Sequence, residues 1–281
     1  MRIGLTGSTG VLGQGIISNW AGPEFVLFNS DIRQFANVDE WFKQAGRLDG
    51  IIHLAALVPV DLVKAEPLRA FAVNVGGTFN LLEVIRRAPE GERPWLFYCS
   101  TSHVYETSLT PLKETSPINP ISLYGHTKAQ ADKWCDIYRS QYGLSVCVGR
   151  VFSYSSPKQP QTYFLPSMIQ KIKNAPKEGT LEARGLYGTR DFVTPIQIAK
   201  AIEFLFSKKA NDTFNIGTGQ GVPLINLVSA LKERLERNDL KIRALETDTN
   251  HLVANVDKLN EAGLKLDFNI KTFLDYILDR P

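Results

Sequence analysis

The sequence has few cysteines, and their number and spacing exclude several classes of site. Only three occur, Cys99, Cys135 and Cys147, and two of them lie in apolar stretches that resemble strands. No CxxC pair or Cys/His cluster has the spacing of metal ligands. We therefore expect buried thiols in a reducing compartment, with neither a disulfide framework nor a metal site.

Long apolar runs and blocks of like charge are also lacking. No apolar run reaches the roughly 18 residues that a membrane span needs. The N-terminus begins with a strand pattern and not with a signal segment. The 32 basic and 29 acidic residues are spread along the chain and give a net charge of +3, which leaves no electrostatic footprint for nucleic acid. We expect a cytoplasmic protein that binds neither nucleic acid nor a membrane.

What the sequence does contain is typical of a globular α/β protein. Of its 281 residues, 43% are hydrophobic and 22% charged, which suits one large domain or two modest ones. Short apolar runs indicate strands at residues 2–6, 25–28, 50–56, 95–101 and 144–152. Helical periods lie between them, at residues 11–20, 38–44, 67–87 and 124–142. This alternation predicts a doubly wound parallel sheet covered by helices on both faces.

The first strand runs directly into a glycine-rich turn, TGSTGVLG, and then into a helix. In such a turn one glycine allows unusual backbone dihedrals, a second lets the backbone approach a pyrophosphate, and a third lets the helix pack closely on the strand. The helix N-terminus offers N–H groups and a positive dipole end to phosphates. The spacing is GxxGxxG and not GxGxxG, but its place after the first strand predicts a dinucleotide site.

Asp31 follows this turn at about the distance, roughly 20 residues, of an acid that binds the ribose 2′-hydroxyl. An acid there favours NAD because it repels a 2′-phosphate, whereas Arg33 could receive that phosphate. Asp31, with Ile32 beside it, could also lie one segment further on and touch the adenine edge. A helix-cap or turn aspartate is the remaining interpretation.

Tyr124 and Lys128 are four residues apart in a predicted helix and therefore share one face. A lysine ammonium near a phenol lowers the tyrosine pKa, so that the tyrosine can exchange protons near neutral pH. The pair alone fits a solvated helix face as well. Thr101 adds support, because it ends an apolar strand at the sheet edge where ligands bind in doubly wound sheets.

Together, TGSTGVLG, HLAA, NVGGT, STSHVY and YGHTK resemble the motifs of the extended short-chain dehydrogenase/reductases. Within these the chain is most similar to the NAD-dependent epimerase/dehydratase family, which acts on nucleotide sugars. RDFV and FNIGTG continue the resemblance further along the chain, so it covers nearly the whole sequence in order. It implies a Rossmann domain over residues 1–152 and a smaller, partly discontinuous substrate-binding region over residues 153–281. Residues from about 189 to 216 would return to the Rossmann sheet.

The resemblance also implies a role for individual residues. Thr101, Tyr124 and Lys128 would form the catalytic triad. Ser102 and His103 would line the sugar pocket, and Arg190 would bind the substrate diphosphate, for which its guanidinium fork is suited. NAD(P) would contact a larger set: Gly7, Thr9, Gly10, Val11, Leu12, Gly13, Asp31, Ile32, Leu54, Ala55, Ala56, Asn74, Tyr124 and Lys128.

Two departures from the family bear on the reaction. Dehydratases carry an Asp-Glu pair directly after the catalytic threonine, where this chain has Ser102 and His103. That difference disfavours dehydration. His103 could act as a general acid or base or form only a polar wall of the pocket, whereas His53 and His126 look structural.

The short chain favours reduction of a 4-keto nucleotide sugar with NAD(P)H, and NAD is favoured over NADP by Asp31. A 4-epimerase that keeps its NAD tightly bound and works through a transient ketone is the alternative. A dinucleotide-binding sensor without turnover is a second alternative, which the retained Tyr124 and Lys128 argue against. The resemblance further suggests a homodimer formed through the helices at residues 67–87 and 124–142.

Overall fold

The computed structural model describes residues 1–245 and 250–279. The chain forms two compact units, and the first comprises Met1–Glu106, Glu114–Val151 and Pro195–Ile216. The second comprises Thr107–Lys113, Phe152–Thr194 and the chain from Gly217 onward. The first boundary thus lies beside the expected one, but the segment of residues 189–216 is divided between the units. Residues 107–113 also join the second unit, because Leu112 exchanges backbone hydrogen bonds with Val253 and Asn255.

The first unit is built on a six-stranded sheet in the order β2-β1-β3-β4-β5-β9. Its strands are β1 (Arg2–Thr6), β2 (Glu24–Phe28), β3 (Gly50–His53), β4 (Trp95–Thr101), β5 (Val146–Val151) and β9 (Thr213–Ile216). Every pairing is parallel, which confirms the predicted doubly wound sheet. All residues of β3 and β5 are buried, as expected for parallel strands covered on both faces.

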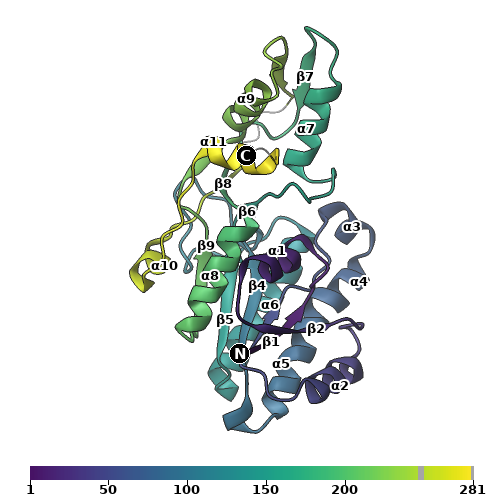
Figure 1. The fold of residues 1–281 in the computed structure, drawn as a ribbon, viewed down its shortest axis with the longest axis vertical. Helices are drawn as coiled ribbons and strands as arrows, with labels where there is room; N and C mark the ends of the chain where they lie inside the picture. Colours follow the sequence, from purple (N-terminus) through teal and green to yellow (C-terminus); the bar gives the residue numbers. More distant parts are fainter. Residues whose placement is uncertain (246–249, 280–281) are drawn as a thin grey trace. The chain divides into compact units, whose positions relative to one another are not determined.

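Seven α-helices and three short helical turns connect these strands among the described residues of the first unit. They are α1 (Val11–Asn19), α2 (Phe35–Ala45), α3 (Val60–Ala65), α4 (Pro67–Phe71), η1 (Ala72–Gly76), α5 (Gly77–Arg87), η2 (Glu90–Glu92), η3 (Ser102–Val104), α6 (Leu123–Tyr142) and α8 (Pro195–Ser207). Helices α1 and α8 pack side by side (Figure 1), and Trp20, which follows α1, stacks edge-on against Phe206 of α8. The helix expected over residues 67–87 is interrupted, because η1 is a π-helical turn.

The strand order reverses beside β1, since the chain first adds β2 on one side of β1 and then β3 on the other. The register pairs Thr6 at the end of β1 with His53 at the end of β3. Ligands of doubly wound sheets bind outside the carboxyl ends of the strands at such a switch point. The glycine-rich turn after Thr6 therefore lies where doubly wound sheets bind their ligands.

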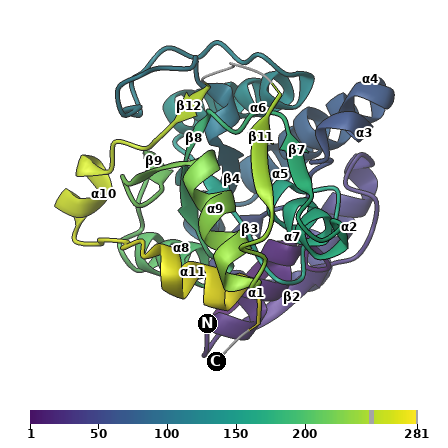
Figure 2. The ribbon, with the colours of Figure 1, turned by 90° about the horizontal axis from the view of Figure 1, so that it is seen from above.

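The second unit has its own core and two small sheets. One sheet has the order β10-β8-β12, with β6 also paired to β8; the other pairs β7 with β11 in parallel (Figure 2). The strands are β6 (Ser153–Tyr154), β7 (Thr180–Ala183), β8 (Thr189–Val193), β10 (Gly221–Pro223), β11 (Lys241–Ala244) and β12 (His251–Leu252). The helices are α7 (Phe164–Asn174), α9 (Leu224–Arg234), α10 (Asp257–Ala262) and α11 (Ile270–Ile277). Apolar side chains of α7, α9 and α11 meet around Phe192 and Phe273.

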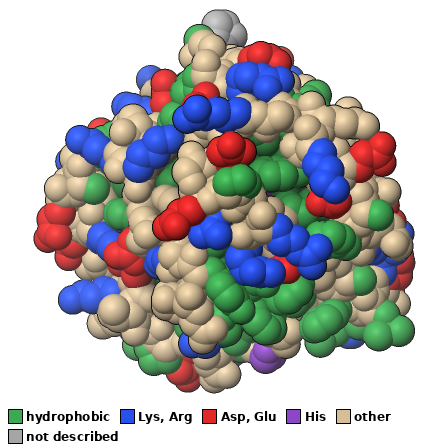
Figure 3. All heavy atoms as spheres, turned by 90° about the horizontal axis from the view of Figure 1, so that it is seen from below, with side chains coloured by type: hydrophobic (Ala, Val, Ile, Leu, Met, Phe, Trp, Pro, Cys, Tyr) green, Lys and Arg blue, Asp and Glu red, His purple; other side chains and the backbone are tan. Residues whose placement is uncertain are grey.

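On the face seen in Figure 3, lysine and arginine side chains lie next to aspartate and glutamate side chains. Within the described ranges, no helix has both the length and the hydropathy of a membrane span.

Candidate active site

The glycine-rich turn has the geometry of a phosphate cradle. Gly7 has a positive φ of 73°, and a Cβ on it would lie 2.7 Å from the backbone nitrogen of Ala55. A Cβ on Gly13 would lie 2.3 Å from the Gly7 carbonyl oxygen, so this glycine allows α1 to pack against the turn. A Cβ on Gly10 would meet only that carbonyl, at 3.4 Å, and no side chain caps the α1 N-terminus. The missing Cβ of Gly10 thus leaves space in front of uncapped helix N–H groups, which suits a pyrophosphate.

The segment after β3 lies against this turn. The predicted contacts Leu54, Ala55 and Ala56 are half-buried and follow β3, which ends at His53 and not at Ala56 as expected. Asn74 holds the next residue, because its amide oxygen accepts from the Leu57 N–H at 2.7 Å and its amide nitrogen donates to the Leu57 carbonyl at 3.0 Å. Asn74 lies within the π-helical turn η1. Such turns often occur at functional sites.

The segment after β2 presents an ion pair. The Arg33 guanidinium donates to both oxygens of Asp31 at 2.6–3.0 Å, and the Arg33 N–H also donates to Asp31. These hydrogen bonds from Arg33 lower the pKa of Asp31. The Ile32 side chain is buried, and a Cβ on Gly77 would lie 2.8 Å from it. The side chains of Asp31 and Arg33 are partly exposed to solvent, whereas Ile32 belongs to the core.

The end of β4 and the start of α6 bring the proposed catalytic residues together. Thr101 ends β4, and its hydroxyl accepts from the backbone N–H of His103 at 3.3 Å. The His103 ring lies edge-on to Tyr124, with 6.2 Å between ring centroids. The Ser102 side chain is 1% exposed, whereas His103 is half-buried. Gly125 permits this approach, because a Cβ there would lie 2.3 Å from the His103 carbonyl oxygen.

Lys128 is buried one helical turn after Tyr124. Its exposed fraction is 3%, and its ammonium lies 4.3 Å from the centre of the Tyr98 ring, a cation–π contact. Burial lowers the pKa of Lys128, although the nearby Cys99 and Asp132 oppose this effect. Tyr124 is itself 9% exposed. A buried Tyr–Lys pair excludes the interpretation of a solvated helix face.

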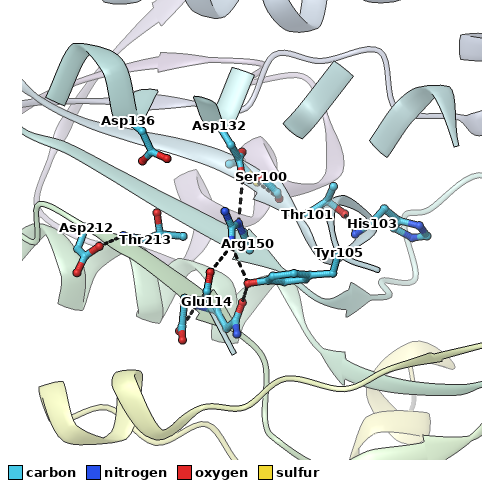
Figure 4. A network of polar contacts seen from close by, with 12 residues as sticks. Ser100, Thr101, His103, Tyr105, Glu114, Asp132, Asp136, Arg150, Asp212 and Thr213 are labelled. Carbon is cyan, nitrogen blue, oxygen red and sulfur yellow. Dashed lines mark hydrogen bonds and ion pairs between the residues drawn. The ribbon is translucent and has the colours of Figure 1, made fainter. Parts of the chain in front are cut away.

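A buried ion pair that the sequence did not reveal lies beside β4, where Ser100 pairs with Arg150 of β5 (Figure 4). Arg150 of β5 donates to Asp132 of α6 at 2.9 Å, to the Tyr105 hydroxyl at 2.9 Å and to the Glu114 carbonyl at 2.8 Å. Burial raises the pKa of Asp132, and Arg150 opposes that shift. Asp132 is four residues after Lys128 and so shares its face; this spacing was the one available signal. The pair ties α6 to β5.

In the second unit, Arg190 and Asp191 of β8 have different surroundings. Arg190 is half-buried, and its Nη1 donates to the carbonyls of Thr189 and Asn250. Asp191 is fully buried and accepts from the Thr218 hydroxyl and from the N–H groups of Thr218 and Gly219. The end of the FNIGTG motif thus forms a turn around the Asp191 carboxylate. The described residues contain no group of three or more His, Cys, Asp or Glu side chains that could hold a metal.

Comparison with known proteins finds similarity to nucleotide-sugar dehydratases and epimerases. The family model of GDP-mannose 4,6 dehydratase matches residues 14–262. The UDP-glucose 4-epimerase of Lacticaseibacillus casei is 27% identical over 237 residues, 75% of this chain and 68% of that protein. That of Streptococcus mutans is 26% identical over 275 residues, 88% of this chain and 80% of the other.

Solved structures share the fold at lower identity. The structure of RMD from Pseudomonas aeruginosa, complexed with NADPH, has a TM-score of 0.87 and 23% identity, and covers 99% of this chain and 97% of its own. The UDP-glucose 4-epimerase of Thermus thermophilus, in complex with NAD, has a TM-score of 0.80 and 23% identity, with 99% of each chain covered.

A doubly wound sheet, a glycine cradle at its switch point and a buried Tyr-x-x-x-Lys pair define an enzyme of the extended short-chain dehydrogenase/reductase type. Within that class the chain belongs to the GDP-mannose 4,6-dehydratase family. It is therefore a member of the nucleotide-sugar epimerases and dehydratases, as the resemblance implied.

Proposed function

We propose that this protein reduces a 4-keto nucleotide sugar with NAD(P)H. The family and the epimerase relatives support a nucleotide sugar as substrate. NAD and NADPH in the similar solved structures support the cofactor. Dehydration is disfavoured, because Ser102 and His103 follow Thr101 where an elimination would need two carboxylates.

The residues at the switch point fit a dinucleotide. Gly10 leaves room for a pyrophosphate at the uncapped α1 N-terminus, Gly7 and Gly13 allow the tight turn and the close packing of α1, and no carboxylate lies in the first turn to repel the phosphates. Thr9, Val11 and Leu12 would line the phosphates, and Leu54, Ala55 and Ala56 would line the adenosine side. Lys128 would hold the nicotinamide ribose. The bound dinucleotide would supply a hydride at its nicotinamide.

Tyr124 would deliver the proton that reduction of a ketone requires. The sugar oxygen would gain this proton as its carbon receives the hydride, and the Thr101 hydroxyl would orient that oxygen. The Lys128 ammonium stabilises the tyrosinate that remains, because an opposite charge favours the ionised form. In the second unit Arg190 would bind the substrate diphosphate, for which the planar fork of its guanidinium is suited.

The observation that favours a reductase over an epimerase is the exposed, already ion-paired segment after β2, which would meet the adenosine end of the cofactor. An epimerase keeps one cofactor through many cycles, whereas a reductase must exchange it at every turnover. After β2, Asn29 and Ser30 are exposed, and Asp31 is already paired with Arg33. A ribose hydroxyl that binds Asp31 would compete with Arg33 for the same carboxylate, which would weaken cofactor binding and favour exchange at each turnover.

An epimerase remains the second candidate, because the two relatives described above carry that name. Two measurements separate the candidates. Mass spectrometry of the protein as purified detects any retained NAD, and a panel of nucleotide sugars is then incubated with C4-deuterated NADH or NADPH. A reductase consumes the cofactor and places deuterium at C4 of the sugar product. Retained NAD and a C4-inverted product without deuterium would instead establish an epimerase.

A further inference from the structure

A buried row of polar side chains lies beneath the glycine-rich turn. Thr6 ends β1, His53 ends β3 and Thr78 lies in the first turn of α5, and none of them is more than 1% exposed. The Thr6 Oγ1 lies 2.7 Å from His53 Nδ1, and His53 Nε2 lies 3.0 Å from Thr78 Oγ1. Buried polar groups must find their partners within the protein, so every proton of this row has to be placed.

The surrounding hydrogen bonds permit only one direction of donation. Thr78 donates its single hydroxyl proton to the Asn74 carbonyl at 2.7 Å. Its oxygen must therefore accept from His53 Nε2, which assigns the proton of the neutral ring to that nitrogen. Nδ1 then accepts from the Thr6 hydroxyl, whose oxygen accepts from the Ala55 N–H at 3.2 Å. The hydrogen bonds thus all point the same way, from the Ala55 N–H through Thr6, His53 and Thr78 to the Asn74 carbonyl.

The Asn74 side chain continues this connection to α6. Its amide nitrogen donates to the Thr127 hydroxyl at 2.9 Å, and Thr127 donates to the Tyr124 carbonyl at 2.8 Å. The other amide hydrogen and the amide oxygen bind Leu57. All hydrogen-bonding groups of the Asn74 side chain are therefore used. Because these bonds reach both Leu57 and Thr127, a shift of η1 would move the loop after β3 together with the helix that carries Tyr124.

His53 keeps this direction of donation at every working pH. Burial, together with the nearby Lys128, lowers the pKa of His53 to about 3. A second proton on Nδ1 would face the Thr6 hydroxyl, which would lose its acceptor. The neutral ring also avoids a second positive charge beside Lys128.

We infer that His53 is a positioning residue of the active site: through Thr6 and Thr78 it fixes the glycine-rich turn relative to Asn74, and so relative to Tyr124 and Lys128. The inference rests on the proposed function, since it concerns a dinucleotide cradle and a proton-donating tyrosine. It assigns to one buried side chain the coupling between cofactor binding and catalysis.

Position 78 offers a matched set of variants. Thr78→Val keeps the shape and breaks the link between His53 and Asn74, whereas Thr78→Ser keeps the hydroxyl. We expect Thr78→Val to lower the single-turnover rate of hydride transfer by about 10- to 100-fold, the cost of a small misplacement of reacting groups, and Thr78→Ser to restore most of it. Ile85→Val, a buried substitution in the same helix, is the control for lost stability. Equal rates for Thr78→Val and Ile85→Val at equal loss of Tm would overturn the inference.

Two measurements that do not depend on turnover complete the test. The ¹⁵N NMR spectrum of the histidines should show His53 protonated at Nε2 and unprotonated at Nδ1 throughout the range from about pH 5 to pH 8. His53→Phe, which keeps a ring but removes both bonds, should weaken NADH and NADPH binding in fluorescence titrations. The opposite tautomer, or unchanged dinucleotide affinity in His53→Phe, would contradict the positioning role. Wild-type protein that binds neither dinucleotide would instead refute the proposed function.

Discussion

At the scale of single residues, the proposed chemistry depends on the Tyr124 phenol and the Lys128 ammonium, which are both shielded from water. Tyr124→Phe keeps the ring and its packing against His103 but removes the ionisable hydroxyl. We expect kcat to fall by about 10²–10⁴-fold, the usual contribution of general acid–base catalysis, with nearly unchanged dinucleotide affinity.

Lys128→Met tests the two roles proposed for the lysine, tyrosinate stabilisation and ribose binding, apart from the proton transfer proposed for Tyr124. It should lower kcat and dinucleotide affinity together, because the ammonium is proposed both to stabilise the tyrosinate and to hold the ribose. Steady-state kinetics on the true substrate and NADH or NADPH titrations measure both effects. Near-wild-type turnover of Tyr124→Phe would make the mechanism wrong, and His103 would then be the first alternative donor to test.

We expect the choice between NAD and NADP to be decided at single residues as well. Arg33 neutralises Asp31, the acid that would repel a 2′-phosphate. The preference for NAD(H) or NADP(H) therefore depends on whether repulsion by Asp31 or attraction by Arg33 is the stronger effect on that phosphate. Arg33→Ala leaves Asp31 uncompensated and should shift the ratio of dissociation constants towards NADH. Asp31→Ala frees Arg33 and should shift it towards NADPH. A wild-type enzyme with a clear NADPH preference would assign the main role to Arg33.

At the scale of elements, sequence patterns predicted the parallel strands well and the interruptions poorly. β1 and β4 have the expected bounds, because buried parallel strands are continuous apolar runs ended by polar or glycine residues. The π-helical turn η1 could not be predicted from a helical period. Its cause is tertiary, since Asn74 turns inward to bind Leu57 and Thr127.

In the candidate site too, residues in local motifs could be predicted from the sequence, whereas residues that meet only in the folded protein could not. The glycines, Thr101, Tyr124 and Lys128 belong to local motifs at fixed spacings, so sequence alone indicated them. Asp132 and Arg150 are 18 residues apart and meet only because α6 packs behind β4 and β5. The role of His53 likewise depends on Thr78, 25 residues further along the chain. Contacts of this kind follow from the folded sheet and not from any local pattern.

Helices α5 and α6 are joined by Glu83, which gives a prediction for acid stability. The carboxylate accepts from Arg86 and Arg87 of its own helix and from the Tyr138 hydroxyl of α6 at 3.0 Å. The hydrogen bond from Arg86 is the main cause that lowers the pKa of Glu83 from 4.5 to about 2. A lowered pKa stabilises the fold above pH 4.5, and this contribution is lost as the pH falls to about 2.

Glu83→Gln should therefore cost about 1 kcal/mol of unfolding free energy at neutral pH and progressively less below pH 4.5. Urea unfolding at a series of pH values measures the difference. Glu203→Gln, an exposed glutamate of α8, is the matched control. A difference between wild type and Glu83→Gln that stayed constant down to about pH 2 would exclude an ionic origin.

At the scale of the whole molecule, the outer surface of α5 and α6 predicts association of two chains. Phe79 stacks edge-on against Trp134 at 5.1 Å and against Tyr138 at 5.8 Å, and Tyr138 lies 4.9 Å from Tyr142. Phe79, Trp134 and Tyr142 remain 36–45% exposed. A contiguous aromatic surface of this kind is typical of an interface. A second copy related by a two-fold axis would cover it with the same surface.

The wild-type protein should accordingly have twice the 31.4 kDa chain mass in size-exclusion chromatography with light scattering. Trp134→Glu places a charge at the exposed Trp134 end of the aromatic row, beside Phe79, and desolvating that charge in an apolar interface is costly. We expect this variant to be monomeric, with a circular dichroism spectrum like that of the wild type, because the side chain lies on the surface. Leu109→Glu, at a side chain that is 84% exposed in the second unit, should remain dimeric. A wild-type monomer, or a dimer that persists in Trp134→Glu, would show that the aromatic row of α5 and α6 does not join two chains.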